Sequence, residues 1–172
     1  MKLSWKAPIL ALVMVFAASL GVAATGPSAA ALPPSLATST LLGTWSLDTS
    51  RMAMPPEQRP TSVRFTFGNA GDDKLAMQVD IVYAPGNEVH SAGTSAIDGG
   101  PSAVKNSPEA DTASFKLPAP NVLVMALQRE GVLVSTRIYS VMPDGRSLTE
   151  TTVYPGENGT VTMKANYFTR VR

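Results

Sequence analysis

The chain has 172 residues, with 14 lysines and arginines against 13 acidic residues, and it contains no cysteine. This length suits one domain of ordinary size, and the lack of cysteine excludes a disulfide framework, a thiol nucleophile and a Cys-ligated metal centre. No basic patch or stripe is visible in the sequence, so nucleic acid is not an expected partner.

The first 24 residues have the three-part layout of a secretory signal peptide. Lys2 and Lys6 precede an apolar run over 7–20, and small residues follow it. Because this run is short for a permanent crossing of about 30 Å of hydrocarbon, we expect cleavage after Ala23 or Ala24 rather than an uncleaved anchor. The mature protein is then expected to be periplasmic or secreted, without a stable membrane span. Removal of two lysines and no acids leaves a net charge of about −1.

Residues 25–40 are rich in alanine, serine, threonine and proline, and include Pro33-Pro34. Such a composition buries little apolar surface and predicts a flexible leader. The folded domain is expected to cover residues 41–172.

The rest of the chain consists of short strand-like runs, separated by glycine, proline, asparagine and aspartate. Short turns of this kind join neighbouring antiparallel strands and leave no room for crossover helices. The segment 49–61 contains Pro55, Pro56 and Pro60, so it is expected to hold one short helical turn at most. The predicted strands, in chain order, are 44–48, 62–67, 74–83, 88–97, 103–105, 112–117, 121–129, 132–141, 147–154 and 160–171.

Apolar and polar residues alternate in several of these runs, as in half-buried strands. In 74–83, for example, Met77, Val79 and Ile81 share one face and oppose Gln78 and Asp80. About ten such strands joined by hairpins predict an all-β fold, an antiparallel up-and-down barrel of about 8–10 strands, with a β-sandwich as the alternative. An outer-membrane barrel would carry aromatic girdles, whereas aromatic residues make up only 6% of this chain.

The stretch Gly43-Thr44-Trp45 resembles the Gly-x-Trp signature with which the first strand begins in the calycins, the lipocalins and fatty-acid-binding proteins. The strand count and the basic last strand are similar as well, and 98–114 looks like part of small exported bacterial lipocalin-like proteins. The resemblance implies that Trp45 closes one end of a barrel and that a basic side chain of the last strand, here Arg170, covers it.

The chain departs from the fatty-acid-binding pattern at one point. That pattern places an Arg-x-Tyr pair in the last strand, where this chain reads Asn166-Tyr167-Phe168. Arg137-Ile138-Tyr139 has the right spacing but belongs to an earlier strand, so a fatty-acid ligand does not follow from the resemblance.

Four residues are candidates for ligand binding: Arg129, Arg137, Tyr139 and His90. If Arg137 and Tyr139 face the interior, Arg137 is a buried cation that requires an anion, and a ligand carboxylate would be one such partner. The alternative is that Arg137 lies on an outward, solvated face. His90 is the only histidine of the chain, and it is either a functional group or an ordinary surface side chain.

No catalytic motif stands out: no Gly-x-Ser-x-Gly elbow occurs, and one histidine cannot build a His-rich metal site. Asp80 and Glu150 would form a carboxylate pair of the glycosidase type only if both faced inward. We therefore expect no catalytic residue, metal or cofactor.

The expected function is that of an exported binding protein that holds a small hydrophobic or amphipathic molecule, such as a lipid, inside the barrel. Two alternatives stay open. One is a small-molecule enzyme in the same barrel (an isomerase, lyase or hydrolase), and the other is an interaction or inhibitor module that acts through its loops.

Overall fold

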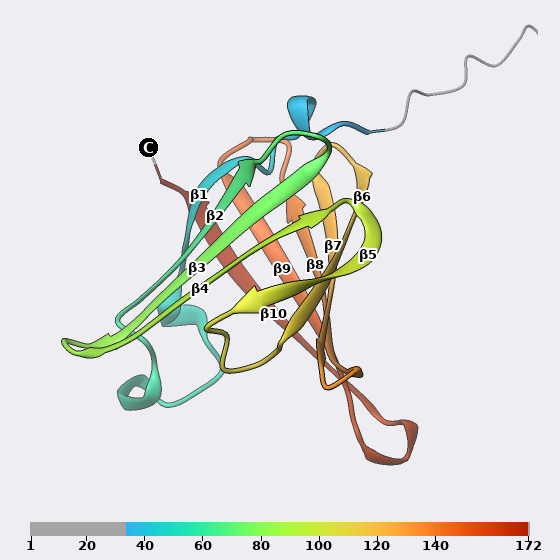
Figure 1. Cartoon of the computed structure of the whole chain (residues 1–172). Coiled ribbons are helices and arrows are strands. Elements are labelled where there is room, and N and C mark those ends of the chain that lie inside the picture. The colour runs from blue at the N-terminus through green and yellow to red at the C-terminus, as the bar shows by residue number, and fades with distance from the viewer. Residues whose placement is uncertain (1–33, 172) are drawn as a thin grey trace, which may run out of the picture. The chain divides into compact units, whose positions relative to one another are not determined.

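The computed structural model describes residues 34–171, and these form a closed antiparallel barrel of ten strands (Figure 1). The expected signal peptide and residues 25–33 of the expected leader lie outside the described residues. Within 34–171, no helix is long and apolar enough to cross a membrane.

Each strand pairs with the strands before and after it in the chain, and β1 also pairs with β10, which closes the ring. The register at this closure places Trp45 opposite Arg170 and Leu47 opposite Phe168. The strands are β1 (Gly43–Leu47), β2 (Ser62–Asn69), β3 (Lys74–Ala84), β4 (Asn87–Ala96), β5 (Asp98–Lys105), β6 (Thr112–Ala119), β7 (Val122–Arg129), β8 (Val132–Val141), β9 (Ser147–Pro155) and β10 (Val161–Arg170).

The predicted fold class is confirmed: the structure is an antiparallel up-and-down barrel rather than a sandwich. Two local expectations were wrong. β5 begins at Asp98, in a stretch expected to be a turn. Its first residues form an irregular strand, in which Gly99 has a positive φ of 97° and the β5–β6 register shifts between Asp98 and Pro101. The segment 49–61 holds two short 3-10 helices, η2 (Thr49–Arg51) and η3 (Pro56–Gln58), instead of one turn at most.

Alternation along the strands points one apolar face of the sheet into the barrel, as a half-buried strand requires. In β10 the alternating apolar residues Val161 and Met163 do not face the interior. Both are exposed, as are all residues of 161–165, and Phe168 is the buried residue of this strand. The inward core residues include Val63, Phe65, Phe67, Leu75, Met77, Phe115, Leu117, Leu123, Met125, Leu127 and Leu148.

One end of the barrel is sealed by Leu36, Leu41 and Trp45, each at most 1% exposed, and we call it the closed end. Leu36 belongs to the 3-10 helix η1 (Leu36–Thr38), in the part of the chain assigned to the flexible leader. Ser39 Oγ donates a hydrogen bond of 2.8 Å to the carbonyl oxygen of Pro120 and so ties this segment to the β6–β7 turn. The folded domain thus includes residues that precede Leu41.

Candidate functional site: a cavity with one charged wall

The barrel encloses a cavity of about 400 Å³ on the side away from the closed end. This volume lies within the range of pockets for small molecules. Met54 and Tyr83 line the cavity and are 37% and 43% exposed, so it reaches solvent between the β1–β2 loop and the end of β3. We call this the open end.

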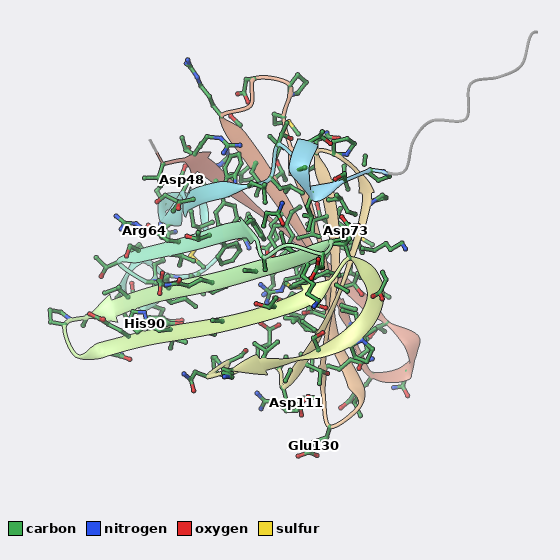
Figure 2. All side chains as sticks on the ribbon, turned by 45° about the horizontal axis from the view of Figure 1, so that its top comes forward. Asp48, Arg64, Asp73, His90, Asp111 and Glu130 are labelled. Carbon is green, nitrogen blue, oxygen red and sulfur yellow. The ribbon has the colours of Figure 1, made fainter. Side chains whose placement is uncertain are left out.

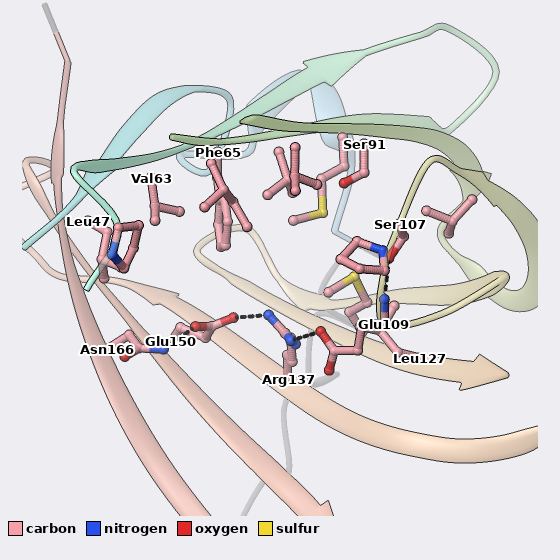
Figure 3. A pocket seen from close by; sticks show the side chains of 18 of the residues that line it. Leu47, Val63, Phe65, Ser91, Ser107, Glu109, Leu127, Arg137, Glu150 and Asn166 are labelled. Carbon is pink, nitrogen blue, oxygen red and sulfur yellow. Dashed lines mark hydrogen bonds and ion pairs between the residues drawn. The ribbon is translucent and has the colours of Figure 1, made fainter. Parts of the chain in front are cut away.

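Most of the cavity lining is apolar. Figure 3 shows Val63 and Phe65 of β2 across the cavity from Arg137 and Glu150. The side chains of β3 continue this lining, and together we call these residues the apolar wall: Val63, Phe65, Met77, Val79 and Ile81. Phe115, Met125 and Leu127 of β6 and β7 also line the cavity, but Met125 and Leu127 lie on the side of Arg137, and Met125 is its cross-strand partner.

A row of hydrogen-bonded polar side chains faces the apolar wall (Figure 3). Arg137 of β8 forms ion pairs with Glu109, from the β5–β6 loop, and with Glu150 of β9, whose Oε1 lies 3.1 Å from Nη1. Asn166 Nδ2 of β10 donates to Glu150 Oε2 at 2.7 Å, and Ser135 Oγ donates to Glu109 Oε1 at 3.1 Å. We call Glu109, Arg137, Glu150 and Asn166 the charged wall.

The sheet register explains how these groups meet. Glu150 is the cross-strand partner of Tyr139 on one side and of Asn166 on the other, and Arg137 lies two residues from Tyr139 on the same face. Residues at such diagonal positions in neighbouring strands lie within reach of long side chains. Glu109 completes the row from a loop, beyond any strand register.

The charged wall is internally compensated. Burial by itself lowers the pKa of Arg137, but negative charges around it, including those of Glu150 and Glu109, raise the pKa above its ordinary value and keep the guanidinium charged. Glu150 is only 1% exposed, so its carboxylate depends on Arg137 and Asn166 for compensation. The Arg137 Nε atom is buried and has no hydrogen-bond partner among the described residues.

Tyr139 does not line the cavity but is packed in the core, towards the closed end. Its ring makes edge contacts with Phe65 and Phe67, at centroid distances of 5.9 and 5.5 Å. Its hydroxyl is near Glu150 and Arg137, but no hydrogen bond of normal geometry forms with any described residue. Burial, reinforced by the negative charge of Glu150, raises the pKa of Tyr139 well above its ordinary value, so the side chain stays neutral.

Of the four predicted ligand-binding residues, the structure brings Arg137 and Tyr139 together and leaves two elsewhere. Arg129, at the end of β7, is exposed and donates a hydrogen bond to the carbonyl oxygen of Pro108. His90 lies on the outer face of β4 with its side chain 58% exposed, 2.7 Å from Asp80 (Nδ1 to Oδ1) (Figure 2). Neither residue lines the cavity. On β4 the inward positions next to His90 include those of Ser91 and Gly93.

The inward placement of Arg137 decides between the two orientations left open by the sequence, but its anions are the protein's own. Glu109 and Glu150 occupy the role proposed for a ligand carboxylate. The pair Asp80 and Glu150 does not form, since Asp80 contacts His90 outside the barrel. No sequence pattern indicates Glu109, because it lies in a loop, whereas the alternation Leu148, Glu150, Thr152 is compatible with an inward Glu150.

At the closed end, Arg170 covers Trp45, as the Gly-x-Trp resemblance implies. The guanidinium lies 4.1 Å from the ring, and its nitrogens donate to the carbonyl oxygens of Leu42 and Gly145, at 2.7 and 2.8 Å. A cation over an indole contributes about 0.5–2 kcal/mol. Gly43 leaves room for this group, because a Cβ atom there would lie 2.7 Å from Arg170 Nη1 and the residue has a φ of +120°.

The closed ten-strand barrel is compatible with a calycin-like fold. The chain matches no known protein-family profile, and no curated protein is significantly similar to it in sequence.

Proposed function

We propose that this protein is an exported, calycin-like carrier that holds one small hydrophobic or amphipathic molecule inside its barrel. The apolar part of the ligand lies against the apolar wall, and the charged wall orients its polar end. Burial of apolar surface provides the affinity, at about 25 cal/mol for each Å² removed from water.

One observation carries the proposal: the barrel is hollow at the open end and packed at the closed end. Phe67, Tyr139 and Trp45 fill the interior towards the closed end, and each is at most 1% exposed. Between Phe65 and the open end, the side chains leave about 400 Å³ that solvent can reach. A pocket of this size, mostly apolar and with a few convergent polar groups, is the usual form of a small-molecule site. The Arg170–Trp45 contact supports the calycin-like part of the proposal.

The test is binding of a neutral hydrophobic fluorophore, N-phenyl-1-naphthylamine, to the purified protein. We expect saturable binding at one site per chain and a rise in the melting temperature with ligand concentration, since a ligand of the native state stabilises it by mass action.

Two tryptophan variants on one strand provide the control. Val79→Trp fills the cavity from the inner face of β3 and abolishes binding, whereas Gln78→Trp adds the same ring on the outer face and preserves it. Circular dichroism verifies that both variants fold, and Ser91→Leu is a milder filling variant should Val79→Trp fail to fold. Equal binding by the inner and outer variants would contradict a site in the barrel.

A further inference from the structure

The cavity is acidic although it contains an arginine. Among its lining residues, only Glu109, Arg137 and Glu150 carry formal charge, which leaves one negative charge in excess. A carboxylate ligand would add a second negative charge to a partly enclosed space, where charges are weakly screened.

Arg137 is not free to receive such a carboxylate. Its two terminal nitrogens are directed at Glu109 and Glu150, and its remaining nitrogen, Nε, has no surface that a molecule in the cavity could touch. An acidic head group would have to displace one of the protein's own carboxylates. Displacement of Glu150 is costly, because its side chain is 1% exposed and would be left buried without its cation.

Glu109 is the acid that a ligand can reach. Its side chain is 31% exposed, compared with 1% for Glu150, and it stands in the β5–β6 loop beside Pro108 and Ser107, which also line the cavity. A carboxylate oxygen that accepts one hydrogen bond has a second lone pair for another donor. A cationic N–H group beside Glu109 would use this capacity and bring the charge of the cavity to zero.

We infer that the carrier selects amphipathic amines, with the ammonium head beside Glu109 and the hydrocarbon body against the apolar wall. This inference rests on the proposed function, since it names the ligand class of the same cavity. The cavity separates the two parts of such a ligand, because the charged and apolar walls face each other across it (Figure 3).

The experiment compares three ligands with the same twelve-carbon chain: dodecylamine, dodecanol and dodecanoate. Each displaces N-phenyl-1-naphthylamine at pH 7.5, below the concentration at which it forms micelles. We expect dodecylamine to bind at least about tenfold more tightly than dodecanoate, with dodecanol between them, as one charge-assisted hydrogen bond allows.

Removal of the single reachable charge tests the position of the head group. Glu109→Gln is expected to reduce the preference for amine over acid to about threefold or less. Glu157→Gln makes the same change at an exposed position of the short 3-10 helix η4 (Glu157–Gly159), away from the lining residues, and is expected to keep the wild-type preference.

The outcomes separate the two proposals. Binding of dodecanoate that equals or exceeds that of dodecylamine overturns the amine inference and leaves the carrier function standing. An amine preference that survives in a folded Glu109→Gln protein also overturns it. Should Glu109→Gln fail to fold, the three ligands with the wild-type protein still decide. If neither the fluorophore nor any of the three ligands binds, the carrier function fails and the inference with it.

Discussion

Arg137 and Glu150 form an ion pair of 3.1 Å across the β8–β9 ladder, and the carboxylate of this pair is almost completely shielded from water. A buried pair of this kind adds little net stability compared with apolar residues, but the loss of one partner is costly, because the other charge remains without compensation.

The first prediction follows from this pair. Arg137→Met leaves Glu150 buried without its cation, so we expect the free energy of unfolding to fall by about 3–5 kcal/mol, measured by urea denaturation. The double variant Arg137→Met, Glu150→Gln removes both charges and is expected to recover most of that loss. Equal stability of the single and double variants would show that the pair carries no such coupling.

The second prediction concerns the closed end. Arg170→Met removes the cation over Trp45 and the hydrogen bonds to Leu42 and Gly145, so we expect a loss of about 1–3 kcal/mol in the free energy of unfolding. Arg170→Lys keeps the charge but not the planar, forked donor set, and is expected to fall between the wild type and Arg170→Met. Tryptophan fluorescence during denaturation measures both. A lysine variant as stable as the wild type would show that charge alone suffices.

The third prediction concerns His90. Hydrogen bonds with Asp80 and with Glu88 raise the pKa of His90 above its ordinary value of 6.5. Protonated His90 therefore stabilises the fold below about pH 6.5, and this contribution to the free energy of unfolding disappears as the pH rises through the raised pKa. Burial raises the pKa of Asp80, but the hydrogen bond from His90 opposes it and the net pKa is lowered, so its contribution is lost only as acid reaches that lowered value.

Nuclear magnetic resonance titration of the ring protons measures this directly, since the chain has one histidine. Asp80→Asn is expected to move the pKa of His90 down towards 6.5, because the charge of the carboxylate is lost and a neutral amide oxygen accepts a weaker hydrogen bond from the imidazolium. An unchanged pKa in Asp80→Asn would rule out this contact as the cause.

The fourth prediction tests whether the segment before β1 belongs to the domain. Leu36 is 1% exposed in the core cluster, so Leu36→Ala is expected to lower the free energy of unfolding by about 2–4 kcal/mol. Leu133→Ala makes the same deletion at a leucine that is 41% exposed, and a change within about 1 kcal/mol is expected there. Thermal denaturation compares the two, and equal effects would argue against a packed role for Leu36.

The sequence predicts the ten strands because each has a turn signal at its ends and most have a period of two. It misplaces the start of β5, since Gly99 and Gly100 are typical of turns and equally compatible with a bulge. The alternation of residues does not predict which face of β8 points inward, because both of its faces mix polar and apolar residues. Glu109 reaches the charged wall from a loop, and the position of a loop side chain depends on the barrel that surrounds it.

The closure of the ring through β1 and β10 has a consequence for folding. The two strands that complete the wall are among the most distant in the chain, and Trp45 meets its partner Arg170 only there. Bringing two such distant strands together costs conformational entropy before their contacts can form, and this slows folding. A chain that emerges N-terminus first from a ribosome therefore keeps one edge of β1 open until β10 has emerged, so the final seam is joined only when all ten strands are available.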